Sequence, residues 1–313
     1  MRYGNYEFRC RFESEAQLPV YKGSTFRGVF GRALKQVVCA LKRQECPDCL
    51  LKPQCLYPMV FEPALLTGRL SASAGVSSPN PYVVEPPLTE ETYYPAGAGF
   101  NFNLILLGPV NTRLPYFVYA ISAMGQIGIG KKIAGKRGRF VIEQVLSEGR
   151  VIYTDRDRTL AGFDSGTELT LSVSEMLPVR KDQATLRVMT PLRLKYDNHL
   201  SPELPFHILV RAMLRRCASL LSHFGDGEPD LDYRGMVQRA AEVETAHSDL
   251  FWEDWRRYSL RQDQAMMMGG LKGSITYAGD LGEFFPLLDF CARVHLGKQT
   301  AFGLGRFTWE IES

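Results

Sequence analysis

The sequence contains no long apolar segment and little excess charge. Apolar runs such as residues 104–107 are far shorter than the roughly 20 residues that a membrane-spanning helix needs, and the residues after Met1 lack the apolar core of a signal peptide. We therefore expect a cytoplasmic protein with no membrane partner. The 313 residues carry a formal net charge of only +3. This excludes a histone-like polycation, so any affinity for nucleic acid must come from local clusters of cations.

Histidine is also scarce. The chain has five, His199, His207, His223, His247 and His295, and none lies in the first half of the sequence. His295 directly precedes a glycine-rich segment and is our candidate among them for proton transfer. It also shares a helical apolar stripe with the residues before it, which fits a buried core imidazole equally well.

That glycine-rich segment, residues 297–307, reads G-K-Q-T-A-F-G-L-G-R-F. Glycine has no side-chain bulk and adopts positive φ, so successive backbone N–H groups can turn toward a phosphate while nearby cations supply charge. A tight turn packed under a helix is the alternative interpretation. The candidate nucleic-acid contacts in this segment are Gly297, Lys298, Gly303, Gly305 and Arg306.

A second segment of the same kind lies in the first half. Apolar residues at helical spacing occupy residues 115–124, and a glycine-rich stretch with Lys131 and Lys132 follows and runs into apolar residues 140–142. The order of helix, cationic glycine-rich loop and strand thus occurs twice. A repeat at this spacing indicates a duplicated domain, because stacked repeat units are only a few tens of residues long.

The first half predicts strands mixed with helices. Residues 6–12 alternate between apolar and polar side chains, as in a strand with one buried face. The next apolar stripe, from Phe26 to Leu41, has helical spacing and begins after Ser24, a residue type that favours helix N-caps. The polar side of this helix carries Arg27, Arg32 and Lys35. Further strands are expected at residues 58–62, 82–85 and 99–107.

The second half repeats this plan. Strands are expected at residues 168–173, 184–195 and 271–277, and helices at residues 206–221 and 281–294. The order β-α-β-β-α-β is the ferredoxin-like pattern. We therefore predict an α+β fold of two tandem ferredoxin-like (RRM-like) domains, each ending in a helix, a glycine-rich loop and a strand. The predicted domains are residues 1–150 and 167–313, with a linker at 151–166 and a helical insertion at 225–261.

Four of the seven cysteines crowd into one short segment. Cys39, Cys46, Cys49 and Cys55 form a C-x6-C-x2-C-x5-C arrangement that could hold a structural Zn²⁺ in a tetrahedral site of four sulfur ligands. An iron–sulfur cluster and free or paired cysteines are the alternatives. We expect this four-cysteine loop to be an insertion in the first domain, without a role in catalysis because four thiolates fill the coordination shell.

Several further motifs carry a resemblance to a known family. The chain resembles the CRISPR-associated endoribonucleases of the RAMP superfamily, which process precursor CRISPR RNA, over nearly its whole length. The motifs are F-R-G-V-F-G-R-A-L at 26–34, F-E-P at 61–63, V-V-E-P-P at 83–87, T-P-L-R-L-K at 190–195, G-G-L-K-G-S-I-T-Y at 269–277, P-L-L at 286–288, H-L-G-K at 295–298 and F-G-L-G-R-F at 302–307.

The resemblance implies an RNA groove between two ferredoxin-like domains and a glycine-rich loop that contacts the substrate backbone. It implies metal-independent cleavage of CRISPR repeat RNA, in which a ribose 2′-hydroxyl attacks the adjacent phosphate to leave a 2′,3′-cyclic phosphate and a 5′-hydroxyl on the mature crRNA. Relatives often place a catalytic histidine in the amino-terminal domain, where this sequence has none. The catalytic candidates are Tyr21, Lys35 and His295.

The predicted RNA contacts are the helix cations Arg27 and Arg32, the lysines 131 and 132, Arg193, and the glycine-rich segment at 297–306. Two other functions remain open at this stage. The missing histidine favours a non-catalytic crRNA-binding subunit, with other CRISPR effector subunits as partners. The four cysteines alone favour a zinc-stabilised structural or DNA-binding module.

Overall fold

The computed structural model describes residues 1–66, 78–162, 166–171, 181–196, 199–200, 202–254, 256–259 and 264–312. The chain divides into two compact units, unit 1 (Met1–Glu168) and unit 2 (Leu169–Ser313). Within the described ranges, no helix has the length and apolar character that crossing a membrane requires.

Unit 1 is built on an antiparallel sheet with the strand order β3-β5-β1-β8-β9, and β10 also pairs with β1. Along β1 the predicted alternation is present, with Tyr6, Phe8, Cys10 and Phe12 buried on one face. The strands of this sheet are β1 (Arg2–Phe12), β3 (Tyr82–Glu85), β5 (Gly99–Leu107), β8 (Phe140–Ser147), β9 (Arg150–Thr154) and β10 (Thr167–Glu168).

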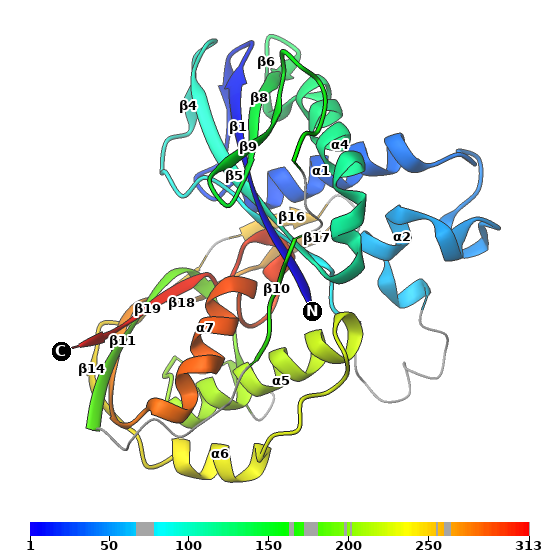
Figure 1. Ribbon diagram of the computed structural model, residues 1–313. Helices are drawn as coiled ribbons and strands as arrows, with labels where there is room; N and C mark the ends of the chain where they lie inside the picture. Colours follow the sequence, from blue (N-terminus) through cyan, green and yellow to red (C-terminus); the bar gives the residue numbers. More distant parts are fainter. Residues whose placement is uncertain are drawn as a thin grey trace. The chain divides into compact units, whose positions relative to one another are not determined.

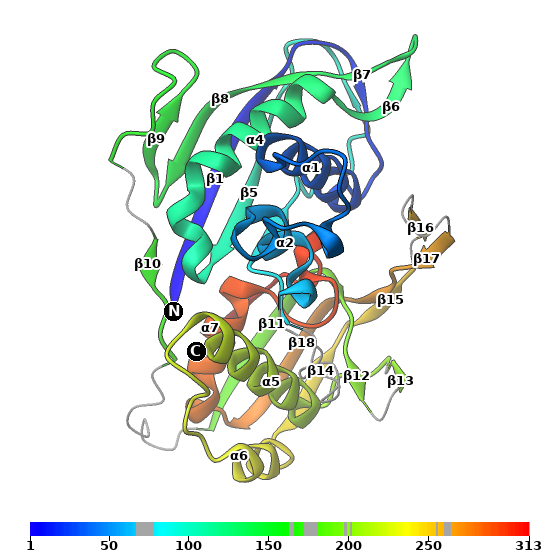
Figure 2. The ribbon, with the colours of Figure 1, turned by 90° about the vertical axis from the view of Figure 1, so that its right-hand side faces the viewer.

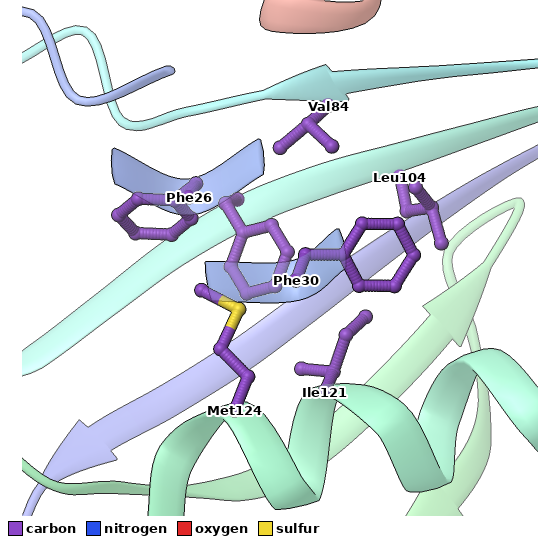
Figure 3. A pocket seen from close by; sticks show the side chains of 7 residues that line it. Phe26, Phe30, Val84, Leu104, Ile121 and Met124 are labelled. Atoms are coloured by element: carbon purple, nitrogen blue, oxygen red, sulfur yellow. The ribbon is translucent and has the colours of Figure 1, made fainter. Parts of the chain in front are cut away.

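Two helices, α1 (Gly23–Val38) and α4 (Leu114–Ile127), lie side by side on one face of this sheet (Figure 1). Figure 3 shows the core that they form, where Phe26 and Phe30 of α1 meet Ile121 and Met124 of α4 over the sheet. The gap between these side chains has no room for a water molecule. It is therefore packed core and not a ligand pocket.

Shorter elements complete unit 1. The small sheet β4-β2-β6-β7 contains a hairpin of β6 and β7, and α2 packs against α1. These elements are β2 (Ala16–Gln17), η1 (Cys46–Asp48), η2 (Lys52–Gln54), α2 (Leu56–Phe61), η3 (Pro63–Leu65), β4 (Tyr93–Tyr94), η4 (Gly108–Arg113), β6 (Ile129–Ile133) and β7 (Lys136–Gly138).

Unit 2 repeats the topology of unit 1. Its antiparallel sheet has the order β14-β18-β11-β19, with β15 also paired to β18, and the helices α5 and α7 pack together beside it (Figure 2). The main elements are β11 (Lys181–Leu192), α5 (Phe206–Phe224), β14 (Glu244–Ser248), β15 (Phe251–Glu253), β18 (Gly270–Asp280), α7 (Phe285–Val294) and β19 (Phe307–Glu312). The others are β12 (Lys195–Tyr196), β13 (His199–Leu200), α6 (Tyr233–Ala240), β16 (Arg256–Ser259), β17 (Gln264–Met267), η5 (Gly282–Phe284) and η6 (Thr300–Phe302).

Both units follow the order β-α-β-β-α-β, and in both the first strand lies between the third and the fourth, with the second at the edge. This is the ferredoxin-like arrangement, so the prediction of two tandem ferredoxin-like domains is confirmed.

Some predicted elements are wrong. The run at 58–62 belongs to the helix α2, because a short apolar run has no periodicity that separates strand from helix. The predicted helical insertion at 225–261 contains one helix, α6, followed by the strands β14, β15 and β16. Residues 150–154, divided in the prediction between domain and linker, form β9 and pair with β8. The predicted N-cap Ser24 lies inside α1, whose N-cap is Lys22.

Candidate nucleic-acid interface

The segment between α7 and β19, residues 295–306, forms a closed loop that we call the glycine loop. At its start, His295 has φ +58° and a fully buried side chain. Its Nδ1 lies 3.1 Å from the carbonyl oxygen of Leu304, and the N–H of Leu296 donates to the carbonyl of Gly305 at 3.0 Å. These bonds tie the two ends of the loop together, so the geometry gives His295 a structural role and favours it less for proton transfer.

The glycines of this loop adopt the positive φ that the sequence predicts, but the reason differs from the prediction. A Cβ on Gly297 (φ +90°) would lie 2.7 Å from the carbonyl oxygen of Arg193, and one on Gly305 (φ +71°) only 1.7 Å from that of Leu296. Such contacts do not occur between real Cβ atoms and backbone. The glycines therefore allow the protein's own backbone segments to approach each other.

Backbone amides of the glycine loop are also used within the protein. The N–H of Lys298 donates to the Arg193 carbonyl at 3.0 Å, and that of Gly305 to the Pro191 carbonyl at 3.1 Å. Gly303 donates in the same way to Thr300 at 2.8 Å. The prediction that these amides turn toward a phosphate is wrong for these three, so they are not available to a nucleic acid.

Cationic side chains gather where the loop meets the end of β11. Lys298 is exposed, and burial followed by the charges of Lys195 and Arg193 lowers its pKa. We call these three residues the loop cation cluster. Like charges this close disfavour one another, and a phosphate placed among them would relieve that repulsion.

Arg306 closes the glycine loop on the opposite side. Its N–H donates to Thr190 Oγ1 at 2.9 Å, and its carbonyl accepts from the N–H of Met189 at 2.8 Å. The side chain is half-buried. Thr190 Oγ1 also donates to the Gly303 carbonyl at 2.8 Å, so β11 fixes the loop through one hydroxyl group.

In unit 1 the second glycine-rich segment forms the β6–β7 hairpin, whose register shifts between Ile129 and Ile133. Lys131 and Lys132 are exposed on β6, and Lys136 is exposed on β7. The sequence from 128 to 139 contains no acidic residue. The hairpin therefore presents a single sign of charge, which suits a phosphate backbone.

The polar side of α1 is arranged by aromatic rings of α2. The Arg27 guanidinium lies 5.2 Å above the centroid of the Phe61 ring, and Lys35 Nζ lies 5.5 Å above that of Tyr57. The two rings stack at 5.4 Å. Cation–π contacts of this kind hold cations in fixed positions. Arg32, on the same helix, is exposed.

Lys35 is a weak candidate for a general base. Partial burial lowers its pKa, but the negative charges of Cys46, Tyr57, Glu45 and Glu62 outweigh that effect, and the net shift is upward. Lys35 therefore stays protonated at neutral pH. This suits a proton donor or a cation that stabilises charge on phosphate.

The other candidate, Tyr21, is half-buried at the entry to α1. Its neighbour Lys22 is fully buried, and its Nζ donates to the carbonyls of Val20 at 3.0 Å and Thr89 at 2.5 Å. Burial lowers the pKa of Lys22, and Glu91 opposes that shift in part. Lys22 thus anchors the segment that carries Tyr21.

The predicted zinc site is not supported. Across the ranges that the structure describes, no three His, Cys, Asp or Glu side chains are grouped so that they could hold a metal ion. Burial raises the pKa of the Cys46 thiol, Lys35 opposes that shift, and Glu62, Cys39 and Cys55 add to it. Cys39 ends the helix α1, Cys46 begins η1, and Cys49 and Cys55 end η1 and η2. The N–H of Cys49 donates to the Cys46 carbonyl at 3.3 Å.

Two family models match the chain, one for each unit. Residues 1–164 match a family model described as an N-terminal domain, and residues 186–307 match the model of the CRISPR-associated endoribonuclease Cas6. The second unit of the chain therefore carries a Cas6 domain. The resemblance inferred from the sequence motifs is therefore confirmed.

Cas6 proteins share the fold at low sequence identity. The Cas6 (TTHB231) product complex, a Thermus thermophilus protein, is 13% identical with a TM-score of 0.55, over 98% of this chain and 100% of that one. A partial Cas6-RT-Cas1–Cas2 complex is 11% identical with a TM-score of 0.60, over 99% of this chain and 46% of that one. An uncharacterized protein of Archaeoglobus fulgidus is 24% identical over 296 residues, 93% of this chain and 92% of that protein.

Sequence reasoning missed the residues that hold the Cas6 glycine loop in place. Thr190 is a buried polar residue near the end of β11. Arg216 follows Arg215 on α5, and Arg215 is exposed. The pattern of the sequence does not show which of the two arginines turns inward. Only the contacts in three dimensions identify them.

Proposed function

We propose that this protein is an endoribonuclease that cuts CRISPR repeat RNA to give mature crRNA. The Cas6 domain of unit 2 carries the proposal. The loop cation cluster supports it, because it gathers three positive side chains next to the segment that most resembles the family, F-G-L-G-R-F at 302–307.

We propose that the RNA backbone is bound by side chains of both units. In unit 2 these are Arg193, Lys195, Lys298 and Arg306, with Gly297, Gly303 and Gly305 shaping the loop that carries two of them. In unit 1 these are Lys131 and Lys132 of the hairpin and the α1 cations Arg27 and Arg32. Phosphate contacts by such side chains supply affinity without sequence preference.

The proposed chemistry is attack of the ribose 2′-hydroxyl on the adjacent phosphate. The P–O5′ bond breaks, the 2′-proton leaves to a base, and the 5′-oxygen takes a proton, so that the products carry a 2′,3′-cyclic phosphate and a 5′-hydroxyl. We propose that this step needs no metal ion, because positive side chains can stabilise the negative charge that develops on the phosphate. Lys35 suits the acid or charge-stabilising role because of its raised pKa, and Tyr21 is the proposed partner for proton transfer. His295, buried in the glycine loop, acts through the loop.

Cleavage of repeat RNA in EDTA tests this proposal. End-labelled RNA from a CRISPR array next to the gene is incubated with the protein, and the expected result is a single cut whose 5′ fragment ends in a 2′,3′-cyclic phosphate. Lys35→Ala is expected to lower the single-turnover rate about 100-fold, within the usual range for a positioned acid. Intact RNA under single-turnover conditions would contradict the enzymatic function.

One observation favours a second function. Because no histidine precedes residue 199 and Lys35 has a raised pKa, unit 1 offers no ordinary general base. A non-catalytic subunit that binds crRNA in a larger CRISPR assembly is the alternative, and the Cas6-RT-Cas1–Cas2 complex is an example of a Cas6 protein joined to other CRISPR proteins. Tight binding of repeat RNA without cleavage would favour this alternative.

A further inference from the structure

One arginine of α5 turns inward and reaches the glycine loop. The Arg216 Nε donates to the carbonyl of His295 at 3.1 Å, and its Nη2 donates to the carbonyl of Val294 at 2.8 Å and to Thr300 Oγ1 at 3.3 Å. Its neighbour Arg215 is exposed on the same helix. Arg216 therefore uses its Nε and Nη2 donors within the protein.

These three acceptors bracket Lys298. Val294 is the last residue of α7, His295 is the residue where the chain leaves the helix, and Thr300 begins the turn η6. Between them the Lys298 N–H is held by the Arg193 carbonyl at 3.0 Å. A planar guanidinium is suited to this task, because it donates in fixed directions to acceptors on both sides of a short segment.

Charge explains why a cation stands at this position. The carbonyls of Val294 and His295 are at the C-terminal end of α7, where the helix dipole places partial negative charge. The last carbonyls of a helix have no partner within the helix, so those of Val294 and His295 need donors from elsewhere in the protein. Burial lowers the pKa of Arg216 to about 10, so the side chain remains positive at neutral pH and matches these carbonyls.

We propose that Arg216 is a positioning residue for RNA binding: it holds both ends of segment 294–300 so that the Lys298 ammonium is presented to an RNA phosphate. This inference rests on the proposed function, because it takes RNA as the ligand of the loop cation cluster. Arg216 itself does not touch the RNA. Its effect on affinity passes through Lys298.

A double-mutant cycle tests this role. Affinity for repeat RNA is measured for the full-length wild type, Arg216→Met, Lys298→Ala and the double variant. Loss of one charged phosphate contact is expected to weaken binding about tenfold. If Arg216 acts through Lys298, Arg216→Met weakens binding by a similar factor in the wild type and by less than twofold when Lys298 is already alanine.

Two matched variants separate positioning from folding. Arg215→Met removes a neighbouring exposed cation and is expected to leave affinity within twofold of the wild type. Thr300→Ala removes one acceptor of Arg216, leaves the arginine in place, and is expected to weaken binding only when Lys298 is present. If Arg216→Met does not fold, Arg216→Lys and Thr300→Ala carry the same cycle.

If the two substitutions act independently, the fold-change in affinity of the double variant equals the product of the two single fold-changes. That result would overturn the inference without affecting the proposal that the protein binds RNA. Failure of the proposed function gives a different result: RNA that is bound but not cut would contradict the enzymatic function and leave this inference standing, whereas a wild type that binds no repeat RNA would remove RNA as the ligand of the cluster. The salt dependence adds a second readout. Arg216→Met is expected to lower the log–log slope by about 0.7, as one lost phosphate contact does for a single strand, although Arg216 makes none. An unchanged slope would count against positioning.

Discussion

Two glycines of α1 show how one residue type serves opposite purposes in one helix. Gly31 is buried against α2, and a Cβ there would lie 2.7 Å from Cε1 of Phe61. Gly28 is exposed, and a Cβ there would meet nothing within 4 Å. The first glycine is required by packing. The second costs helix stability without any compensating contact inside the protein.

Alanine at these two positions is expected to act with opposite sign. Gly28→Ala should raise the free energy of unfolding by roughly 0.5–1 kcal/mol, because it removes the conformational entropy cost of a helical glycine. Gly31→Ala should lower it by roughly 1 kcal/mol, because Phe61 must shift. Urea denaturation of both variants measures the difference. A change of the same sign in both would contradict the packing described for α1 and α2.

Lys298 makes RNA affinity sensitive to pH. Burial and the neighbouring cations lower its pKa, so in the free protein it loses its proton at a lower pH than an ordinary lysine does. A phosphate binds the protonated form, so the contribution of Lys298 is present below this pKa and is lost as pH rises through it. Between pH 7 and about pH 9.5, the affinity of the wild type is expected to fall several-fold more than that of Lys298→Arg, whose guanidinium stays charged. If the affinities of the two proteins fall in parallel as pH rises, Lys298 does not contact the RNA.

At the residue scale, the sequence predicts the backbone conformation of the loop glycines better than it predicts what that conformation is used for. Positive φ at Gly297, Gly303 and Gly305 was predictable from composition alone. That several loop amides donate within the protein was not, because two of the acceptors, the carbonyls of Pro191 and Arg193, lie about 100 residues away in the sequence, at the end of β11 and just after it. The four cysteines misled for a related reason: their spacing matches metal sites, but spacing says nothing about where the side chains of a turn point.

At the scale of elements, the β6–β7 hairpin is the part of unit 1 where exposed lysines are closest together in the sequence. Its lysines are exposed, and no carboxylate in the segment from 128 to 139 offsets them. The register pairs Ile129 with Gly138 and Ile133 with Lys136, so Lys131 and Lys132 lie between the two pairs, where the register shifts. Several exposed lysines on one hairpin suit contacts with successive phosphates more than contact with a single phosphate.

Removing the hairpin charges is expected to change the salt dependence of RNA binding. If both lysines contact phosphates, Lys131→Ala combined with Lys132→Ala should lower the log–log slope by about 1.4, at roughly 0.7 per contact. Arg150→Ala on β9, also exposed in unit 1, is the matched control and should leave the slope unchanged. A slope that stays at the wild-type value in the lysine variant would show that the hairpin lies outside the interface.

Long elements could be predicted, and short ones could not. β5 spans 99–107 as the alternating pattern predicts, and α5 follows the long apolar stripe from Phe206. The helix α2 has only six residues, and its Tyr57 and Phe61 stack one turn apart. The packing of α2 against α1 is a contact that a local sequence pattern does not encode. The strands β14 and β15 take their conformation from pairing with β18, and their own sequence does not specify it.

At the scale of the whole molecule, the chain repeats one topology twice and uses the two copies differently. Each unit has the same strand order, and the sequence predicted this because the helix, glycine-rich segment and strand recur in both halves. Unit 2 places its cations on a loop tied to β11, whereas unit 1 places them on a hairpin and on α1. Duplication therefore explains the fold, and the positions of the cations explain which parts of each copy are proposed to meet RNA.

The central claim is that the glycine loop and the hairpin hold repeat RNA. Photo-crosslinking of 4-thiouridine-substituted repeat RNA to the wild-type protein, followed by mass spectrometry of the crosslinked peptides, tests it most directly. The account predicts crosslinks in the peptides that contain residues 293–306 and 128–139. Crosslinks that avoid both peptides, in a complex that binds the same RNA tightly, would contradict it.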